Sequence, residues 1–178
     1  MASEKISARD LVIIGLLAAV ICVLSPWALP LGAVPVTLGS FAVCLVSSVF
    51  GWKRGVAAVG VYVLVGLIGL PVFAGFAGGA HRLFGPAGGF LLGYIPCAAL
   101  VGALASKGSF WRRCAGMVLG ALCCYACGTT WYAMQSGAEL PAALAVCVTP
   151  FLPGDVIKTI AAALLAGLLQ KRLGKVIN

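Results

Sequence analysis

An acid and a base stand close together in a part of the chain that is otherwise apolar. Asp155 and Lys158 lie in the stretch 150–158, and the apolar run 159–169 follows directly. Ionisable side chains are costly inside a bilayer, and those found there usually face a protein interior or a water-filled cavity. At positions i and i+3 of a helix, the two side chains share one face. They therefore form either an internal salt bridge or a ligand site.

We favour the ligand site, because a buried ion pair adds little net stability by itself. Asp155 would accept hydrogen bonds from ligand N–H groups, and Lys158 would donate to a carbonyl or carboxylate oxygen. Two prolines, Pro150 and Pro153, interrupt the preceding chain, so a helix is expected to begin near Pro153. The free N–H groups of that helix start favour an anion at Asp155.

Other arrangements that could support catalysis are missing from the sequence. The chain has one histidine, His81, and four acidic residues, and it has no G-x-x-x-x-G-K-[ST] nucleotide-binding motif. Cys124 and Cys127 form a C-x-x-C in an apolar run, so an intramembrane thiol enzyme is the rival hypothesis. The simpler interpretation is that both cysteines pack as small apolar side chains. We therefore predict a binder or carrier of a small solute, without enzymatic activity, a metal or a cofactor of its own.

The composition indicates a membrane protein. The chain has 178 residues, of which 62% are hydrophobic and 9% charged, whereas a soluble domain carries about 25% charged residues. A soluble fold of this size could not bury so much apolar surface. The apolar segments are long and continuous, which favours helices over a membrane barrel. We expect an all-α integral membrane protein, folded as a single domain over residues 1–178, without a cleavable signal peptide.

Six transmembrane spans are predicted, at 11–27, 37–50, 55–70, 88–106, 114–134 and 153–170. Charged loops are expected at 52–54 and 107–113, and a short helix or re-entrant piece at 141–148. Six spans put both termini on one side of the membrane. With the termini in the cytoplasm, every lysine and arginine except Arg82 and Lys158 lies on the inner side, as the positive-inside rule requires. Positive charge spread in this way excludes nucleic-acid binding, which needs a concentrated basic surface.

A glycine-rich segment, 71–90, connects the third and fourth spans on the outer side. So many glycines disfavour a helix and allow the backbone to approach a ligand closely. Aromatic and cationic side chains, including His81 and Arg82, stand near its centre. We therefore favour a binding loop over a flexible connector, and we expect the loop to lie on the same outer half as Asp155 and Lys158.

A pair of small residues, Gly15 and Ala19, lies on one face of the first span. Small residues four apart let a second helix approach closely. The face could dock a partner protein, or it could pack within the chain. The spacing alone does not distinguish these two interpretations.

Three stretches together resemble the BioY family, the biotin-binding S components of energy-coupling factor (ECF) transporters. They are V-P-V-T-L at 34–38, G-L-P-V-F-A at 69–74 leading to F-G-P-A-G-G-F-L-L-G at 84–93, and L-P-G-D-V-I-K at 152–158. Their order and the six-span plan match, so the resemblance covers nearly the whole chain. It implies an S-component bundle in the cytoplasmic membrane that captures biotin and takes part in its uptake. An S component for another vitamin is the alternative.

The resemblance also implies roles for individual residues. The implied substrate-binding residues are Thr37, Phe73, Gly75, Arg82, Phe90, Tyr94, Asp155 and Lys158. Asp155 and Lys158 would hold the ureido ring, the aromatic residues would form walls, and Arg82 or a backbone N–H would hold the carboxylate. It stays open whether Lys158 binds the ring or the carboxylate. Gly39 stands where the family often has glutamine, and Gly75 where a polar residue is common, so each loses a side-chain hydrogen bond.

The implied partners are a transmembrane coupling subunit and two ATPase subunits, which use ATP. Gly15 and Ala19 lie where S components carry an A-x-x-x-A docking motif, so these two residues are implied to contact the coupling subunit. The sequence leaves open whether the chain transports alone, as a homo-oligomer, or only with ATPase partners.

Overall fold

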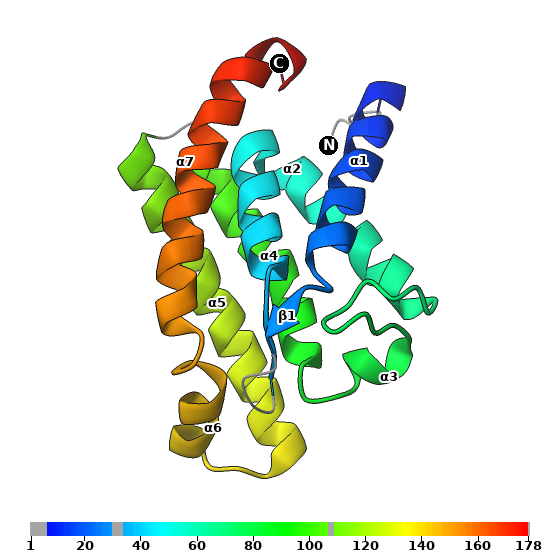
Figure 1. The fold of residues 1–178 in the computed structure, drawn as a ribbon, viewed down its shortest axis with the longest axis vertical. Helices are drawn as coiled ribbons and strands as arrows, with labels where there is room; N and C mark the ends of the chain where they lie inside the picture. The colour runs from blue at the N-terminus through cyan, green and yellow to red at the C-terminus, as the bar shows by residue number, and fades with distance from the viewer. Residues whose placement is uncertain (1–6, 30–33, 107–108, 178) are drawn as a thin grey trace, which may run out of the picture.

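The computed structural model describes residues 7–29, 34–106 and 109–177, with side chains as far as residue 173. The helices are α1 (Ala8–Leu24), α2 (Gly39–Leu67), α3 (Ala80–Leu83), α4 (Gly88–Ala105), α5 (Phe110–Ser136), α6 (Leu140–Cys147) and α7 (Leu152–Ile177). Two short antiparallel strands, β1 (Ala28–Leu29) and β2 (Val36–Thr37), pair between α1 and α2. The sequence analysis did not predict this strand pair. In Figure 1, α3 and α6 lie at the end opposite the start of α1 and the end of α7.

Four helices are long and apolar enough to cross a membrane: α2, α4, α5 and the 152–173 part of α7. α1 is shorter, at 17 residues, whereas a span needs about 20. These helices indicate a multi-pass membrane protein. The predicted short helix before the last span is confirmed as α6, and α7 begins at Leu152 with Pro153 in its first turn.

α2 is broken at Gly51, where φ is 83° and ψ is 172°. Glycine adopts such a positive φ without a steric penalty. The chain turns back at this point and brings Gly55 against Ser47. A Cβ on Gly55 would lie only 2.6 Å from the Ser47 Oγ. The predicted charged loop over 52–54 is therefore wrong. Those residues are helical, since a single glycine makes the reversal.

The predicted loop before the fifth span is also too long. α5 begins at Phe110, so Arg112 and Arg113 lie in its first turn, while Lys107 falls outside the described residues. Ser109 precedes the helix with an extended backbone, as is common for serine at this position. The last helix continues beyond the predicted end at Gln170.

α4 and α5 pack closely through a row of small residues. Gly116, Gly120, Cys124 and Gly128 recur every fourth position of α5, a spacing that lets two membrane helices approach. A Cβ on Gly120 would lie 2.6 Å from the Val101 Cγ2, and one on Gly128 would lie 2.4 Å from the Phe90 Cζ. The row therefore fixes the position of the Phe90 ring.

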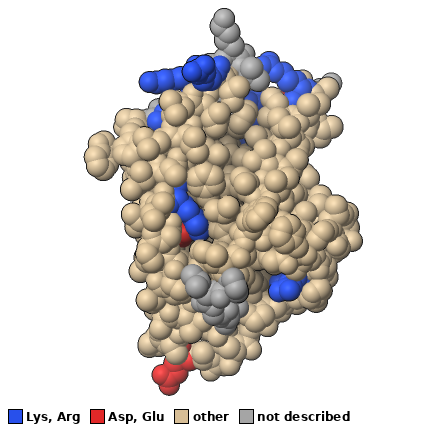
Figure 2. All heavy atoms as spheres, in the orientation of Figure 1, with Lys and Arg blue, Asp and Glu red and all other residues tan. Residues whose placement is uncertain are grey.

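Positive charge gathers at one end of the molecule. Figure 2 shows most visible lysine and arginine side chains at the end where α1 begins and α7 finishes. The described cations that the sequence analysis assigned to this end are Arg9, Lys53, Arg54, Arg112, Arg113, Lys171 and Arg172. Asp10 lies 2.8 Å from Arg54 and so links α1 to the second half of α2. The charge distribution therefore gives the bundle a definite polarity along its long axis.

Candidate functional site

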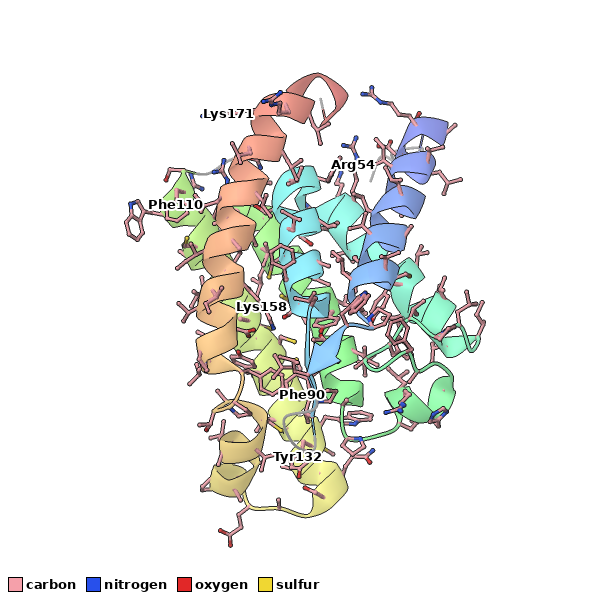
Figure 3. The ribbon with its side chains drawn as sticks, in the orientation of Figure 1. Arg54, Phe90, Phe110, Tyr132, Lys158 and Lys171 are labelled. Atoms are coloured by element: carbon pink, nitrogen blue, oxygen red, sulfur yellow. The ribbon has the colours of Figure 1, made fainter. Side chains whose placement is uncertain are left out.

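A cavity lies among α2, α4, α5 and α7, beneath the loop that precedes α4. Its volume, measured for the centre of a water molecule, is about 150 Å³. The predicted site residues on its wall are Thr37, Phe73, Arg82, Phe90, Tyr94, Asp155 and Lys158. Figure 3 shows Phe90 and Lys158 pointing into the same region between the helices. The fold thus brings together residues that are more than 100 positions apart in the sequence.

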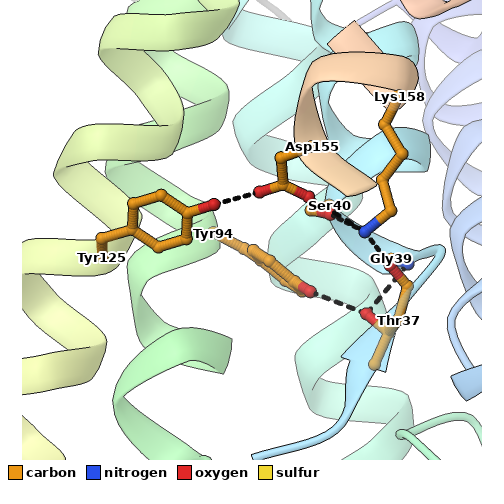
Figure 4. A network of polar contacts seen from close by, with 7 residues as sticks. All are labelled: Thr37, Gly39, Ser40, Tyr94, Tyr125, Asp155 and Lys158. Carbon is orange, nitrogen blue, oxygen red and sulfur yellow. Dashed lines mark hydrogen bonds and ion pairs between the residues drawn. The ribbon is translucent and has the colours of Figure 1, made fainter. Parts of the chain in front are cut away.

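Lys158 is the centre of the polar part of the wall (Figure 4). Its Nζ donates to the Thr37 carbonyl oxygen at 2.8 Å, to the Asp155 Oδ1 at 3.0 Å and to the Ser40 Oγ at 3.4 Å. An ammonium group has three protons, so these contacts occupy all of them. The side chain is only 15% exposed. The contact with Ser40 is the longest and is therefore the weakest.

Asp155 has hydrogen-bonding capacity left over. Its Oδ1 contacts Lys158, and its Oδ2 accepts a hydrogen bond from the Tyr125 hydroxyl. A carboxylate offers about four acceptor positions, so roughly half of them stay available to a ligand. Its side chain is 17% exposed, and it lines the cavity. Tyr125 and Lys158 together hold the carboxylate in a fixed orientation.

Thr37 joins the strand pair to the same network. Its Oγ1 lies 3.2 Å from the Tyr94 hydroxyl and accepts a hydrogen bond from the Gly39 backbone N–H at 3.1 Å. Thr37 lies in β2, whereas the sequence analysis placed it at the start of the following helix. Its carbonyl faces Lys158, so the strand pair connects α7 to α4.

Aromatic rings form much of the remaining wall. Phe90 and Phe151 stack with ring centroids 5.9 Å apart and an interplanar angle of 10°. Phe73 meets Tyr62 edge-on at 5.5 Å and occupies the space above Gly66, where a Cβ would lie 2.0 Å from its Cζ. One polar patch in an otherwise apolar cavity is typical of a site for a small molecule.

Comparison with known proteins identifies the family. Residues 1–175 match the family model described as BioY. The chain belongs to the BioY family. The biotin transporter BioY of Thermotoga maritima is 42% identical over 167 residues, which cover 92% of this chain and 96% of that protein. The biotin transporter BioY2 of Lactococcus lactis subsp. cremoris is 37% identical over 166 residues, covering 90% and 88% respectively.

A solved structure supports the same assignment. The crystal structure of the S-component for biotin from an ECF-type ABC transporter aligns with a TM-score of 0.83 and 25% identity, covering 96% of this chain and 95% of that one. The BioY resemblance seen in the sequence is thereby confirmed. Membership of a family of transport proteins also argues against the rival hypothesis of an intramembrane thiol enzyme.

In this BioY protein the glycine-rich loop is ordered over the cavity. Trp131 donates to the Gly85 carbonyl at 3.0 Å, and Gln135 donates to the Phe84 carbonyl at 2.8 Å, so α5 holds one side of the loop. On the other side, the Gly75 N–H donates to the Pro26 carbonyl at 3.0 Å. The fixed contacts on both sides favour the binding-loop interpretation over a flexible connector.

Of two predicted binding residues in the loop, Arg82 lines the cavity and Gly75 does not. Arg82 is exposed but lies on the cavity wall. Gly75 is not among the residues lining the cavity, although the loop passes over the site. Its φ of +72° favours glycine, so its position is explained by the turn it makes.

The two cysteines of the C-x-x-C lie on α5, where Cys124 packs against α4 and Cys127 is exposed. Cys124 is buried, and its Sγ approaches the Phe90 carbonyl oxygen at 3.7 Å. A Cβ on Gly93 would lie 3.2 Å from both the Cys124 Sγ and the Cys127 Cβ. Both thiols are free. The burial of Cys124 matches the packing interpretation.

The small-residue pair of α1 points away from the bundle. Gly15 and Ala19 are exposed, and a Cβ on Gly15 would meet no atom within 4 Å. The core-facing residues of α1 are instead Ile14, Leu17, Ala18 and Ile21. Gly15 and Ala19 therefore remain available for contact with another helix.

The sequence analysis missed several residues of the cavity wall. Tyr125, Ser40 and Phe151 lie in mostly apolar segments, where such residues are ordinarily part of the core. Tyr125 carries a signal that could have been used, because a buried phenol usually has a hydrogen-bond partner. The few polar groups predicted near it, Asp155 and Lys158, were the natural candidates.

Proposed function

We propose that this chain is the substrate-binding S component of an ECF transporter, which captures biotin and delivers it across the cytoplasmic membrane. The observation that carries the proposal is the Asp155–Lys158 pair in the polar wall of a cavity lined by aromatic side chains. The BioY family membership and the named functions of the relatives support the same substrate. The chain acts as one binding domain and carries out no chemical step.

The polar wall matches the ureido ring of biotin, which has two N–H donors and one carbonyl acceptor. Asp155 accepts from one N–H through its unused acceptor positions. Lys158 donates to the carbonyl after exchanging its longest contact, the one to Ser40 at 3.4 Å. The two groups lie 3.0 Å apart, so they can bind neighbouring atoms of a single ring. We therefore assign Lys158 to the ring and not to the carboxylate.

The rest of the ligand follows from this placement. The bicyclic body and the valeryl chain lie against Phe73, Phe90 and Tyr94, which are buried and line the cavity. The carboxylate reaches Arg82, which lies on the wall and is exposed. A planar guanidinium suits a carboxylate because it offers paired N–H donors. A closed loop above the ligand excludes water from the polar contacts.

We further propose six membrane crossings with both termini in the cytoplasm. The break at Gly51 divides α2 into two crossing segments, and α1 spans by tilting little or by borrowing flanking residues. The gathering of cations at the end where α1 begins and α7 finishes supports a cytoplasmic position for that end (Figure 2). The cavity and the glycine-rich loop then lie toward the outer face.

The partners are a transmembrane coupling subunit and two ATPase subunits. The exposed, apolar face of α1 around Gly15 and Ala19 suits contact with a helix of the coupling subunit. Energy for uptake comes from ATP hydrolysis by the ATPase subunits. When the S component docks on the coupling subunit, it reorients in the membrane and releases the substrate on the inner side. Whether a homo-oligomer replaces these partners is decided by uptake assays with and without them.

Direct binding tests the proposal. The purified chain is expected to bind biotin without ATP or metal, as measured by isothermal titration calorimetry. A competition panel with thiamine and riboflavin separates biotin from other vitamins. Retention of radiolabelled biotin that neither vitamin displaces supports the proposal. Absence of both heat and retained label, or displacement by another vitamin at equal concentration, contradicts it.

A further inference from the structure

The Ser25 hydroxyl has no hydrogen-bond partner among the described residues. Ser25 follows α1, and its backbone N–H bonds to the Ile21 carbonyl at 2.9 Å. Its side chain is 1% exposed and lies on the cavity wall. The Tyr62 phenol lies beside the Ser25 hydroxyl and interacts with it, but the two groups do not have the distance and angles of a hydrogen bond. A buried hydroxyl is thus directed toward the binding site without a protein partner.

Such a group is unusual, because most buried side-chain polar atoms are hydrogen-bonded. Leaving a buried hydroxyl unpaired costs about 1–3 kcal/mol. Other described hydroxyls share this feature: those of Ser47, Ser48 and Thr129 are also buried and unpaired. None of these three lines the cavity. Ser25 therefore differs from them by its position next to the ligand space.

Gly39 places Ser25 within the polar wall. A Cβ on Gly39 would lie 2.7 Å from the Ser25 Oγ, 3.0 Å from the Tyr94 Oη and 3.1 Å from the Thr37 Oγ1. Three hydroxyl groups therefore converge beside the Gly39 Cα, and a larger residue at position 39 would push them apart. Two of them already interact, because Thr37 and Tyr94 lie 3.2 Å apart. Ser25 is the member of this group whose hydrogen-bonding capacity is unused.

The count of donors and acceptors indicates what Ser25 binds. The two N–H groups of a ureido ring point away from each other, so one carboxylate accepts from only one of them. Lys158 is a donor only, and the Thr37 Oγ1 already accepts from the Gly39 N–H. A hydroxyl can accept as well as donate. The second ureido N–H therefore needs an acceptor other than Asp155 and Lys158, and a wall hydroxyl without a partner can supply it.

We propose that the Ser25 hydroxyl accepts a hydrogen bond from the ureido N–H that Asp155 does not reach. This assignment rests on the proposed function, since it names a further contact with biotin. Ser25 and Asp155 then hold the ring from two sides, with Lys158 at the carbonyl between them. The hydroxyl has no partner among the described residues and is satisfied when the ligand binds.

The test compares Ser25→Ala with Ser47→Ala in the full-length purified chain. Both variants remove a buried, unpaired hydroxyl, but only the first removes one from the cavity wall. Biotin affinity is measured by isothermal titration, and the melting temperature is measured without ligand. We expect Ser25→Ala to bind biotin about 2- to 10-fold more weakly and to melt at the same or a higher temperature. Ser47→Ala should keep wild-type affinity.

A second ligand identifies the end of biotin that Ser25 contacts. Biotin methyl ester keeps the ureido ring and changes only the carboxylate. The ratio of wild-type to Ser25→Ala affinity should be the same for both ligands. Unchanged biotin affinity in Ser25→Ala, an equal loss in Ser47→Ala, or a ratio that disappears with the ester would each overturn the assignment. Failure of the wild-type chain to bind biotin would instead refute the proposed function, together with this contact.

Discussion

The Asp155 carboxylate and the Lys158 ammonium lie 3.0 Å apart in the cavity wall. Each neutralises the charge of the other, and each can also bind a ligand. Breaking a buried pair by removing one member leaves an uncompensated charge, which destabilises a protein by about 3–5 kcal/mol. Tyr125, Thr37 and Ser40 hydrogen-bond to the pair and hold it in place. The pair is therefore prepared for binding before the ligand arrives, and reorganising it on binding requires only the exchange of a weak contact.

Substitution of either charged residue should abolish tight binding. Truncating one partner of a buried, hydrogen-bonded charge pair typically costs about 2–5 kcal/mol of binding free energy, so Asp155→Asn and Lys158→Ala should each lower biotin affinity roughly 30-fold or more. The measurement is isothermal titration, with the melting temperature as a check on folding. The double variant Asp155→Asn/Lys158→Met removes both charges and is the control for stability. It should fold and still fail to bind, whereas wild-type affinity in all three variants would leave only a structural salt bridge.

The sequence revealed this pair because charge is conspicuous in an apolar run. It did not reveal Tyr125 or Ser25, because a tyrosine or serine in a membrane helix is compatible with several environments. Only the packing of α5 against α7 brings the Tyr125 hydroxyl to Asp155. Residue types therefore predicted the charged part of the cavity wall, and tertiary contacts determine its neutral hydrogen-bonding partners.

At the scale of elements, the break in α2 depends on two glycines. Gly51 makes the turn, and Gly102 on α4 lets the turn approach, because a Cβ there would lie 2.4 Å from the Trp52 Cα. The sequence predicted two helices in this region but placed a loop of three residues between them. A one-residue reversal has no distinct composition, and Trp52, Lys53 and Arg54 resemble an interfacial loop. This explains why the boundary was missed.

Gly102→Ala should destabilise the protein, because the contact to be accommodated is with the backbone of Trp52. The control is Gly60→Ala, since Gly60 also lies in a helix but has open space where the alanine methyl group would stand, with no atom within 4 Å. Alanine is favoured over glycine in a helix by about 1 kcal/mol, so Gly60→Ala should melt at the same or a higher temperature. Thermal unfolding in detergent gives both values. A Gly102→Ala variant as stable as Gly60→Ala would show that the turn can move away from α4.

The exposed face of α1 should affect uptake without affecting binding. Gly15→Trp or Ala19→Trp adds a bulky side chain to a surface that contacts no other part of the described chain closely. Biotin uptake by cells that express the ATPase partners should fall strongly, while biotin binding to the purified variants stays at the wild-type level. Ala103→Trp is the control, because Ala103 is an exposed small residue on α4. Loss of binding and uptake together would assign Gly15 and Ala19 to internal packing.

At the scale of the whole molecule, two properties coincide along one axis. Cations gather at the end where α1 begins and α7 finishes (Figure 2), while the glycine-rich loop and α6 lie toward the other end (Figure 1). Composition and charge were sufficient to predict the membrane class and this polarity. The cavity could not be predicted in the same way, because its wall combines residues from the strand pair, the loop and four long helices.

The proposed topology makes a prediction for the two halves of α2. If each half crosses the membrane, residues on either side of the second half must lie on opposite faces. A phosphatase reporter, which is active only outside the cytoplasm, should be inactive when fused after Lys53 and active when fused after Gly78. A fluorescent protein that folds only in the cytoplasm should be bright at the C-terminus and dark after Gly137, between α5 and α6. Equal phosphatase activity at the two fusion sites would mean that the second half of α2 enters and leaves on one side, and the chain would then have fewer than six crossings.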